Sequence, residues 1–362
     1  MTVAAIILAA GEGTRMRSSR PKPLHLICGR PMVMHVIHAL SGLEMERTVV
    51  VVGHGAERVT KKVQEQAPSS AHVTFVEQVE QRGTGHAVIV GLTAFPDDDL
   101  DDTSTVVVLP GDTPLLRPDT IEELVGIHES SGAAATMLTA RMPDPTGYGR
   151  VIRAKDGRVV AIVEQRDADA EQRAIDEINT GIYAFRRDLL GPALRRLSPD
   201  NAQSEYYLTD VISVLAGMGH RVGSVVAPDF AETQGVNDRW QLALAERELR
   251  SRTNRRWLLN GVTMLDPRQT FIDVTVELGR DVTLFPGTIL QGRTVIGDGA
   301  EVGPHSRLID CVVGSGCRVE NTVAEDCEIG DDCRVGPFAS LGAGSHLPAG
   351  TVTGPFYTGR AD

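Results

Sequence analysis

Residues 3 to 16 read Val3-Ala-Ala-Ile-Ile-Leu8-Ala-Ala-Gly-Glu-Gly-Thr-Arg15-Met16, an apolar run that passes directly into a loop of small residues. The run predicts a buried strand over residues 3–8. Small residues after a strand let backbone N–H groups approach a phosphate chain closely, because no side chain blocks the way. Arg15 and, further along, Lys22 add positive charge for the far end of such an anion. This stretch therefore predicts a phosphate-binding loop at the end of a strand.

Short apolar runs and amphipathic segments alternate through the first ~230 residues, and this alternation predicts an α/β fold. Further strands are predicted at 48–52, 73–76 and 105–109, and helices at 32–40, 56–66, 84–93 and 118–130. Alternation at this pitch predicts a parallel sheet covered on both faces, and such sheets bind ligands at the carboxyl ends of their strands. The 9–22 loop and the Gly111-Asp112 turn are therefore expected to share one edge.

The composition limits the classes of partner. The chain has 362 residues, enough for two domains, and a formal net charge of −12 that argues against a nucleic-acid groove as the main site. A local nucleotide pocket is not excluded by that charge. We expect no membrane span, since no run of about 18 apolar residues occurs, and no signal peptide at the N-terminus. Five cysteines without C-x-x-C spacing favour a reducing cytoplasm.

Residues 238–259 contain no Gly or Pro and predict one long helix, capped by Asn237 or Asp238. Four basic residues near its end suit the helix C-terminal dipole: Arg250, Arg252, Arg255 and Arg256. We interpret this helix as an exposed connector between domains in preference to an anion site.

A different pattern begins after Pro267, where aliphatic residues recur mostly at every sixth position and small residues follow four positions later. The aliphatic positions are Ile296, Val302, Leu308, Val313, Val319, Val323, Ile329, Val335, Leu341 and Leu347. The small positions are Ala300, Ser306, Val312, Cys317, Cys327, Cys333, Ala339 and Ser345. A period of six predicts a parallel β-helix of about four coils over residues ~270–353. The spacing is shorter than six between 308 and 313 and between 319 and 323, and we interpret both places as irregular corners. We interpret the cysteines of the repeat as inert packing residues.

Together these motifs resemble one known family, the bacterial N-acetylglucosamine-1-phosphate uridylyltransferases called GlmU, in a C-terminally shortened form. The resemblance covers nearly the whole chain. It rests on Leu8-Ala-Ala-Gly-x-Gly-Thr-Arg-Met16, Pro21-Lys-x-Leu-His25, Gln81-Arg-Gly-Thr-Gly-His-Ala87, Asp144-Pro-Thr-Gly-Tyr-Gly-Arg150, Glu177-Ile-Asn-Thr-Gly181, Glu205-Tyr-Tyr-Leu-Thr-Asp210 and Gly235-Val-Asn237.

The resemblance implies a Rossmann-like nucleotidyltransferase domain at 1–235, a linker helix at 236–261 and a short left-handed β-helix at 262–362 that forms a homotrimer. It implies Arg15 and Lys22 as catalytic cations and Asp112 with Asn237 as Mg²⁺ ligands. Nucleotide-binding positions would be Leu8, Ala9, Ala10, Gly11, Gly13, Thr14, Gln78, Gly83, Thr84 and Gly111. The amino-sugar phosphate would be bound by Gly149, Glu164, Asn179, Thr209 and Asn237.

The reaction that the resemblance implies is transfer of UMP from UTP to N-acetylglucosamine 1-phosphate, giving UDP-N-acetylglucosamine, a cell-wall precursor, and pyrophosphate. The sugar phosphate is already an anion, so no general base is needed, and positioning and charge neutralisation carry the catalysis. Outside its motif, Asp112 could equally be explained as a residue that caps a turn and not as a metal ligand. Glu164 could also be an ordinary residue at the end of a strand. His25 and His86 are interpreted as structural.

The sequence departs from the family pattern at two places. Pro110 stands where the family commonly has Tyr, which puts one substrate contact in doubt. Relatives also continue the β-helix into an acetyltransferase site, whereas Ser340 and Gly342 stand at its Arg-bearing positions here, so we expect acetyl transfer to be absent. Three alternatives stay open: a uridylyl- or thymidylyltransferase for another sugar 1-phosphate, a non-catalytic scaffold subunit, and a hexapeptide acyltransferase.

Overall fold

The computed structural model describes residues 3–95 and 104–359, which form two compact units. The first unit comprises Met1–His25 and Pro31–Leu242, and the second comprises Leu26–Arg30 and Ala243–Asp362. Residues 1–2, 96–103 and 360–362, which fall inside the predicted domain ranges, lie outside the described residues. The contiguous ranges predicted from the sequence did not anticipate that residues 26–30 belong to the second unit.

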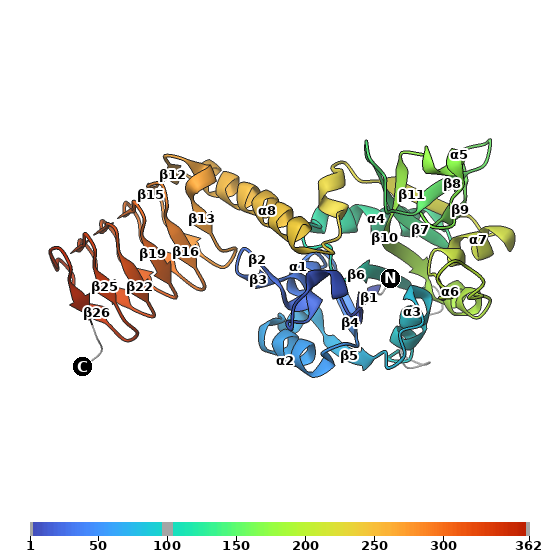
Figure 1. Cartoon of the computed structure of the whole chain (residues 1–362), viewed down its shortest axis with the longest axis horizontal. Helices are drawn as coiled ribbons and strands as arrows, with labels where there is room; N and C mark the ends of the chain where they lie inside the picture. The colour runs from blue at the N-terminus through green and yellow to red at the C-terminus, as the bar shows by residue number, and fades with distance from the viewer. Residues whose placement is uncertain (1–2, 96–103, 360–362) are drawn as a thin grey trace. The chain divides into compact units, whose positions relative to one another are not determined.

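The first unit is built on a mixed sheet in which the strands lie in the order β11-β7-β10-β6-β1-β4-β5 (Figure 1). In addition, β8 pairs with β10, and β9 pairs with β8. These strands are β1 (Val3–Ala9), β4 (Met45–Val52), β5 (Val73–Glu77), β6 (Thr105–Pro110), β7 (Ala135–Arg141), β8 (Arg150–Arg153), β9 (Val159–Val163), β10 (Glu177–Arg186) and β11 (Val222–Val226). The pairs β1–β4, β1–β6 and β4–β5 are parallel, as predicted. The prediction of a parallel sheet is wrong for β10, which runs antiparallel to both β6 and β7. Hydrophobic runs report burial and not strand direction, so this reversal carries no sequence signal.

Helices cover both faces of this sheet, so the central strand β1 is buried on both sides. Ala5 and Ile7 pack in one cluster with helices α1, α2 and α4, whereas Ala4 and Ile6 pack in the other with α3, α6 and α7. The helices are α1 (Met32–His38), α2 (Ala56–Gln66), α3 (Thr84–Leu92), α4 (Pro118–Ser131), α5 (Ala170–Arg173), α6 (Arg187–Leu194) and α7 (Asp210–Gly217). The four predicted helices are confirmed, with small differences at their ends. Pro118 occupies the first turn of α4, where its missing N–H costs no hydrogen bond.

The predicted long helix is confirmed as α8 (Arg239–Leu259), and its cap is Asp238, whose carboxylate accepts the N–H of Gln241 at 2.8 Å. Most of α8 is at least partly exposed, and its fully buried residues are Ala245, Thr253 and Asn254. None of the helices within the described ranges combines the length and the apolarity needed to cross a bilayer.

The second unit is the predicted parallel β-helix, with three sheets of short parallel strands (Figure 1). The first sheet holds β12 (Thr263–Met264), β15 (Thr283–Leu284), β18 (Glu301–Val302), β21 (Arg318–Val319) and β24 (Arg334–Val335). The second holds β13 (Phe271–Ile272), β16 (Ile289–Gln291), β19 (Arg307–Ile309), β22 (Val323–Glu325), β25 (Ser340–Leu341) and β27 (Thr358–Gly359). The third holds β14 (Glu277–Leu278), β17 (Val295–Ile296), β20 (Val312–Val313), β23 (Glu328–Ile329) and β26 (His346–Leu347). This architecture is consistent with a left-handed β-helix.

Both spacing slips fall at corners, as predicted. Ile289 pairs with Arg307 on the next coil, and Arg307 pairs in turn with Val323, so the second of these coils is the shorter. The shortened corners contain Asp310 and Asn321, which have left-handed φ values of 52° and 44°. Asp and Asn tolerate this conformation better than most other residues.

Two positions of the sixfold repeat do not face the core. Val323 stands at an aliphatic position of the repeat, but its exposure is 54%, and the neighbouring Ala324 is fully buried instead. Likewise Val312 is 48% exposed, and Cys311 takes the buried position. Successive side chains of a strand point to opposite faces. A spacing that is one residue shorter therefore turns the expected position outward and its neighbour inward.

Candidate active site

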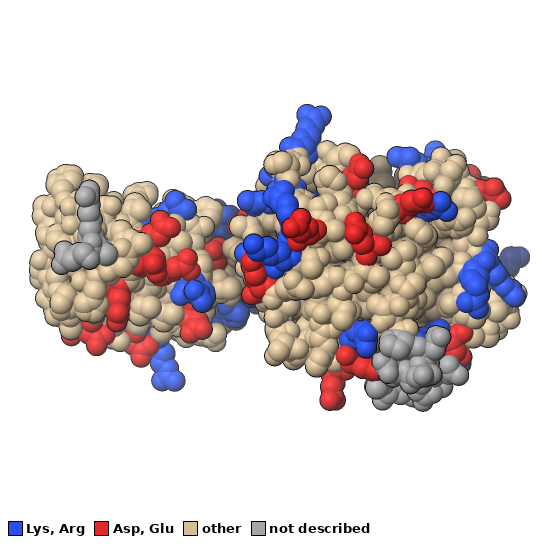
Figure 2. Space-filling view, turned by 90° about the horizontal axis from the view of Figure 1, so that it is seen from below, with Lys and Arg blue, Asp and Glu red and all other residues tan. Residues whose placement is uncertain are grey.

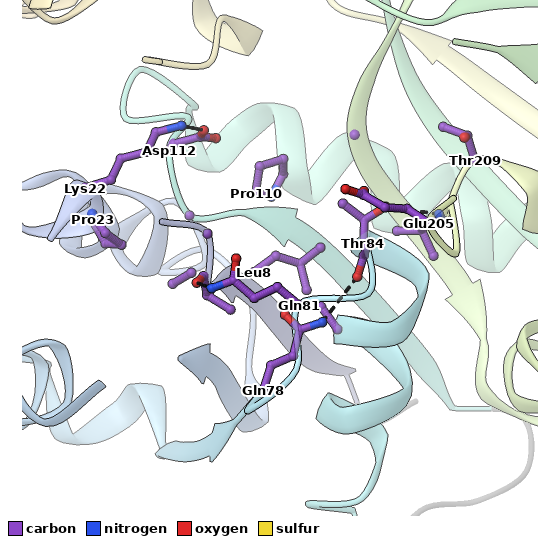
Figure 3. A pocket seen from close by; sticks show the side chains of 18 of the residues that line it. Leu8, Lys22, Pro23, Gln78, Gln81, Thr84, Pro110, Asp112, Glu205 and Thr209 are labelled. Atoms are coloured by element: carbon purple, nitrogen blue, oxygen red, sulfur yellow. Dashed lines mark hydrogen bonds and ion pairs between the residues drawn. The ribbon is translucent and has the colours of Figure 1, made fainter. Parts of the chain in front are cut away.

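A cavity of about 410 Å³ opens at the carboxyl-end edge of β1 and β6 (Figure 3). Leu8 near the end of β1 pairs with Pro110 at the end of β6. The small-residue loop and the Gly111-Asp112 turn therefore share one edge, as the strand alternation predicted.

Most of the residues predicted for the site line this cavity. They are Leu8, Ala9, Ala10, Gly11, Lys22, Gln78, Gly83, Thr84, Gly111, Asp112, Glu164, Asn179 and Thr209. The predicted residues that do not line it are Gly13, Thr14, Arg15, Gly149 and Asn237. Each of these five residues nevertheless contacts a residue that lines the cavity or lies close to one in the sequence.

Gly13 holds the small-residue loop close to Lys22. Its φ of 64° is left-handed, and a Cβ built on it would lie 2.6 Å from the Cβ of Lys22. It precedes the 3₁₀ turn Thr14–Met16, which carries Arg15. A larger residue at 13 would therefore strain the backbone and displace Lys22 at once.

Four side chains from distant parts of the chain meet beside the cavity. The Lys22 ammonium contacts the Asp112 carboxylate and donates to Asn237 Oδ1 at 2.8 Å. Arg15 Nη2 donates to the same Asn237 oxygen at 3.1 Å. Asp112 and Asn237 are brought together by the backbone, because Val236 N–H donates to the Asp112 carbonyl at 2.9 Å. We call Arg15, Lys22, Asp112 and Asn237 the cation cluster.

The cation cluster has a donor set that fits a magnesium ion. Asp112 supplies a carboxylate oxygen and Asn237 an amide oxygen, and both point at one positive charge, the Lys22 ammonium. Oxygen ligands from one or two side chains, completed by phosphate oxygens and water, are the usual way in which proteins bind Mg²⁺. Asp112 and Asn237 are thus the residues that could hold the ion.

The other side of the loop presents amide groups suited to reading a base. The Gln78 side chain is 4% exposed, and its Nε2 lies 3.3 Å from the Gly83 carbonyl and 3.0 Å from His86 Nδ1. Gln81 Nε2 donates to the Ala10 carbonyl at 2.8 Å and ties this segment to the small-residue loop. His86 thus contacts a glutamine and no acid–base partner among the described residues. Burial lowers the pKa of His25, and the nearby Arg239 lowers it further.

At the far end of the cavity the amide of Asn179 is oriented by two donors. Its Oδ1 accepts the hydroxyl of Tyr183 at 2.9 Å and the backbone N–H of Gly181 at 3.2 Å. Tyr183 is 1% exposed, so its ring is fixed by the surrounding core. Since the oxygen is occupied, the amide Nδ2 is left to donate to a ligand.

Glu164 and Thr209 complete this end. Thr209 Oγ1 donates to Glu164 Oε1 at 3.2 Å. Burial raises the pKa of Glu164, and the hydrogen bond from Thr209 partly offsets this rise. A Cβ added at Gly149 would lie 3.0 Å from Ile162 and 3.4 Å from Glu164, so glycine leaves this carboxylate room. The far end therefore presents a hydrogen-bond acceptor at Glu164 and a donor at Asn179.

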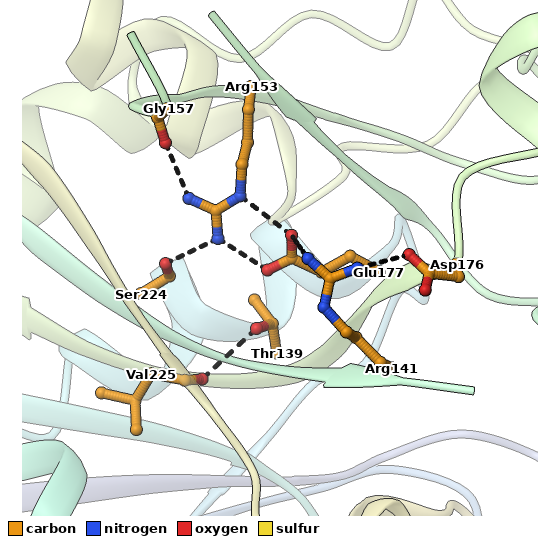
Figure 4. Close-up of polar contacts among 8 residues, drawn as sticks. All are labelled: Thr139, Arg141, Arg153, Gly157, Asp176, Glu177, Ser224 and Val225. Carbon is orange, nitrogen blue, oxygen red and sulfur yellow. Dashed lines mark hydrogen bonds and ion pairs between the residues drawn. The ribbon is translucent and has the colours of Figure 1, made fainter.

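An ion pair between a buried glutamate and a partly exposed arginine supports the strand that carries Asn179 (Figure 4). Arg153 of β8 donates to both carboxylate oxygens of Glu177 on β10, at 2.9 and 2.6 Å, and also to Ser224 Oγ at 2.9 Å on β11. Burial is the largest single influence and would raise the pKa of Glu177. The hydrogen bonds from Arg153 and Thr139 and the charges of Arg153 and Arg141 together outweigh it, so the pKa lies below its ordinary value. Arg153 therefore joins β8 to β10 and β11, and Glu177 does not line the cavity.

Sequence reasoning missed several lining residues as site residues: Pro23, Gln81, Ala87, Gly181, Tyr183, Glu205 and Leu208. Gln81, Glu205 and Leu208 lie inside motifs that carried the resemblance, so those motifs could have indicated them. No motif indicated Tyr183, because it lies in an apolar stretch that is typical of an ordinary strand. Pro110 also lines the cavity, at the position noted as a departure from the family pattern.

Comparison with known proteins agrees with this geometry. The nucleotidyl transferase family matches residues 4–257. Bifunctional protein GlmU of Thermobifida fusca is 53% identical over 327 residues, which cover 90% of this chain and 67% of that protein. Bifunctional protein GlmU of Streptomyces avermitilis is 51% identical over 356 residues, covering 98% and 72%, and that of Geobacillus thermodenitrificans is 47% identical over 337 residues, covering 93% and 71%.

The chain belongs to the GlmU family. The resemblance inferred from the motifs is thereby confirmed, as are the Rossmann-like nucleotidyltransferase fold and the enzyme class. The protein is a nucleotidyltransferase of the UDP-N-acetylglucosamine pyrophosphorylase type. The cavity that fits GlmU-type nucleotidyl transfer is lined entirely by residues of the first unit.

Proposed function

We propose that the chain transfers UMP from UTP to N-acetylglucosamine 1-phosphate and releases pyrophosphate. One observation carries this proposal: a single cavity has the cation cluster beside one end and the donor–acceptor pair of Asn179 and Glu164 at the other. Two phosphorylated substrates need positive charge where their phosphates meet, and a sugar needs neutral hydrogen-bonding groups further away.

The proposed step forms one bond and breaks one. An oxygen of the sugar phosphate attacks the α-phosphorus of UTP, and the bond from that phosphorus to the bridging oxygen of the β-phosphate breaks. The electron pair leaves with pyrophosphate. No proton has to be removed from the nucleophile, so the cavity needs no general base.

The basic residues of the cation cluster neutralise charge during this step. Arg15 contacts the leaving pyrophosphate, and Lys22 contacts the phosphoryl group that is transferred. To reach the phosphates, Lys22 exchanges its contact with Asp112 for one with the nucleotide. Asp112 and Asn237 would then be free to hold Mg²⁺, which supplies further neutralisation of phosphate charge when bound.

Selection of the substrates follows from fixed amides. Gln78, Gly83 and Thr84 read the uracil edge, since a base that lacks matching groups leaves buried polar atoms unpaired. The Asn179 Nδ2 donates to an acceptor of the sugar or its acetamido group, and Glu164 accepts from a hydroxyl or N–H. Gly149 permits the close approach.

A steady-state assay tests this proposal with UTP and dTTP, each combined with N-acetylglucosamine 1-phosphate and glucose 1-phosphate. We expect the highest kcat/KM for UTP with the acetamido sugar. A preference for glucose 1-phosphate by about tenfold or more contradicts the sugar assignment, since one unmatched polar group costs about that factor. A protein inert toward all four combinations supports the scaffold alternative.

We further propose that the residues described here do not carry acetyl transfer. The histidines of the β-helix are His305 and His346, and His346 lies 3.4 Å from Glu328 with a side-chain exposure of 59%. An exposed histidine paired with an exposed carboxylate does not offer the enclosed site that acyl transfer uses. Acetyl-CoA consumption with glucosamine 1-phosphate as acceptor contradicts this proposal.

For assembly we propose a homotrimer formed through the β-helix, in a cytoplasmic protein that draws on the cellular UTP supply. Outward-facing valines on paired strands support it: Val295 is 36% exposed and its strand partner Val312 is 48% exposed. Contiguous exposed apolar surface favours association. Light scattering over a dilution series tests the state, and a monomer at micromolar concentration contradicts the trimer.

A further inference from the structure

A second cavity, of about 350 Å³, lies within the second unit between one face of α8 and the 3₁₀ turn Pro267–Gln269. The helix contributes Arg247, Arg250, Asn254, Arg255 and Leu258, and the turn contributes Pro267 and Arg268. The helix positions are mostly three or four apart, so they form one continuous stripe along α8. The volume is within the range of small-molecule pockets.

The charge on the walls of this cavity is largely uncompensated. Arg268 lies 3.5 Å from Asp266, and the single acidic lining residue, Glu248, already pairs with Arg252 at 2.8 Å. Over the described ranges of the chain, no carboxylate forms an ion pair with Arg247, Arg250 or Arg255. The cavity therefore gathers three positive charges without counter-ions from the described part of the protein. Figure 2 shows, on one face of the molecule, how Lys and Arg gather in some places and Asp and Glu in others.

The helix dipole, which suits basic residues at the end of α8, does not explain Arg247 and Arg250. The dipole acts within the last turn of a helix. Arg247 and Arg250 both lie well before the last turn of α8, which ends at Leu259. The dipole therefore does not account for these two residues, which line the cavity.

The walls are held in place by buried contacts. Asn254 is 1% exposed, and its Nδ2 donates to the carbonyls of Pro267 and Thr270 at 2.7 and 2.9 Å, which fastens the turn to the helix. Asn254 Oδ1, in the residue that lines the cavity, has no hydrogen-bond partner among the described residues. Arg250 lies over the ring of Phe271 at 4.3 Å. Stacking holds the guanidinium by its face and leaves its N–H edges available to a ligand.

We propose that this cavity binds a small anion that carries a diphosphate group. Arg247 and Arg255 begin about 12 Å apart along the helix axis at the usual rise per residue. Their guanidinium groups nevertheless line the same cavity as that of Arg250, and a diphosphate offers the three groups more acceptor oxygens, on two phosphoryl groups, than a single phosphate does. Arginine forms bidentate hydrogen bonds with phosphate oxygens. The negative charge of a diphosphate would balance the three positive charges that lack counter-ions in this cavity.

Binding at this site has a structural consequence inside the second unit. The anion contacts both α8 and the Pro267–Gln269 turn, so it adds to the attachment that Asn254 provides. We therefore expect the anion to stabilise this unit against unfolding, since it binds the folded form only. The proposal does not depend on the nucleotidyl transfer reaction.

Calorimetry with inorganic pyrophosphate tests the proposal. The 362-residue chain is used with Arg15→Ala and Lys22→Ala, in a chelator and without magnesium, so that the active site loses its own anion-binding groups. We expect one remaining site, and its affinity falls by about tenfold or more in a further variant with Arg247→Gln, Arg250→Gln and Arg255→Gln. Orthophosphate is expected to bind this site about tenfold more weakly than pyrophosphate, because it spans fewer arginines.

A matched control carries Arg280→Gln, Arg293→Gln and Arg334→Gln, which remove the same charge from exposed positions of the β-helix outside the cavity. An equal loss in both triple variants, or no binding to the starting protein, overturns the proposal. Equal affinity for orthophosphate overturns the diphosphate assignment. If the cavity variant fails to fold, hydrogen exchange on the starting protein decides: protection by pyrophosphate must appear at 247–258 and 266–270, and its absence there overturns the proposal.

Discussion

In the first unit the cation cluster joins residues 15, 22, 112 and 237, whereas in the β-helix stacked neighbours such as Ile289 and Arg307 are only one coil apart in the sequence. The site depends on contacts between distant segments at the ends of strands. The β-helix depends on a repeated local contact, with each coil packing on the one before it. Activity and stability should therefore respond to different substitutions in the two regions, and the following experiments test how completely they separate.

The largest expected effect is on activity. Asp112→Ala removes the carboxylate of the cation cluster, and we expect kcat/KM to fall by about 1,000-fold, the size seen when a charge-stabilising group is lost. The melting temperature should change little, since Asp112 is partly exposed. Asp119→Ala, in the first turn of α4, is the control outside the cavity and should retain full activity. Retention of more than about a tenth of the activity by Asp112→Ala contradicts the metal-ligand role.

The converse effect is expected in the β-helix. Leu308 is fully buried between Leu290 and Ala324 of the adjacent coils, and Ala324 is too small to fill the space that Leu308→Ala leaves. We expect a loss of about 3 kcal/mol in the free energy of unfolding with kcat unchanged. Denaturant unfolding and the transfer assay measure the two quantities. A parallel drop in kcat would show that the two regions are coupled.

An intermediate effect should follow from the residue that orients Asn179. Tyr183→Phe removes one donor to the Asn179 oxygen while the ring stays in the core. We expect kcat/KM for the sugar phosphate to fall by about tenfold, the value of one buried hydrogen bond, with the KM for UTP unchanged. Tyr357→Phe, in the β-helix, is the matched control and should have no effect on either constant. Equal changes for both substrates would point to a general loss of packing.

The smallest effects concern ion pairs. Glu177, with a side-chain exposure of 4%, pairs with Arg153, whereas Glu301 pairs with Arg318 at 3.3 Å on the surface of the β-helix. Glu177→Gln should cost about 1 kcal/mol at neutral pH, because the Arg153 side chain is partly exposed, and Glu301→Gln less than about 0.5 kcal/mol. Denaturant unfolding of the two variants beside the wild type measures both losses, and equal losses contradict the difference in burial as their cause.

The effect of Glu177→Gln should also depend on pH. The folded-state pKa of Glu177 lies below the ordinary value of 4.5, so the stability it adds is complete above pH 4.5 and is lost as the pH falls through the lowered pKa. The difference in unfolding free energy between the wild type and Glu177→Gln should shrink accordingly. A difference that stays constant down to acid pH contradicts this account.

Several features could be predicted because they depend on local order. The helix at Pro118, the strand at Val3 and the hexad repeat follow from period and turn residues, and they agree with the structure. The two repeat positions that face outward, Val312 and Val323, stand beside the spacing slips, where a shift of one residue exchanges inside for outside. The direction of β10 left no trace in the hydrophobic pattern.

The amino-acid order alone determined the small-residue loop, the two basic residues after it and the repeating coils, because each depends on neighbours within a short stretch of chain. The motifs could name Lys22, Asp112 and Asn237, but only the folded chain makes one ammonium contact both oxygens. Tyr183 is a site residue because its hydroxyl donates to Asn179, a contact that only the structure shows. The arginines of α8 line a cavity because Asn254 fastens the following turn to the helix. Contacts between distant segments arise from packing the whole chain, and no local pattern encodes them.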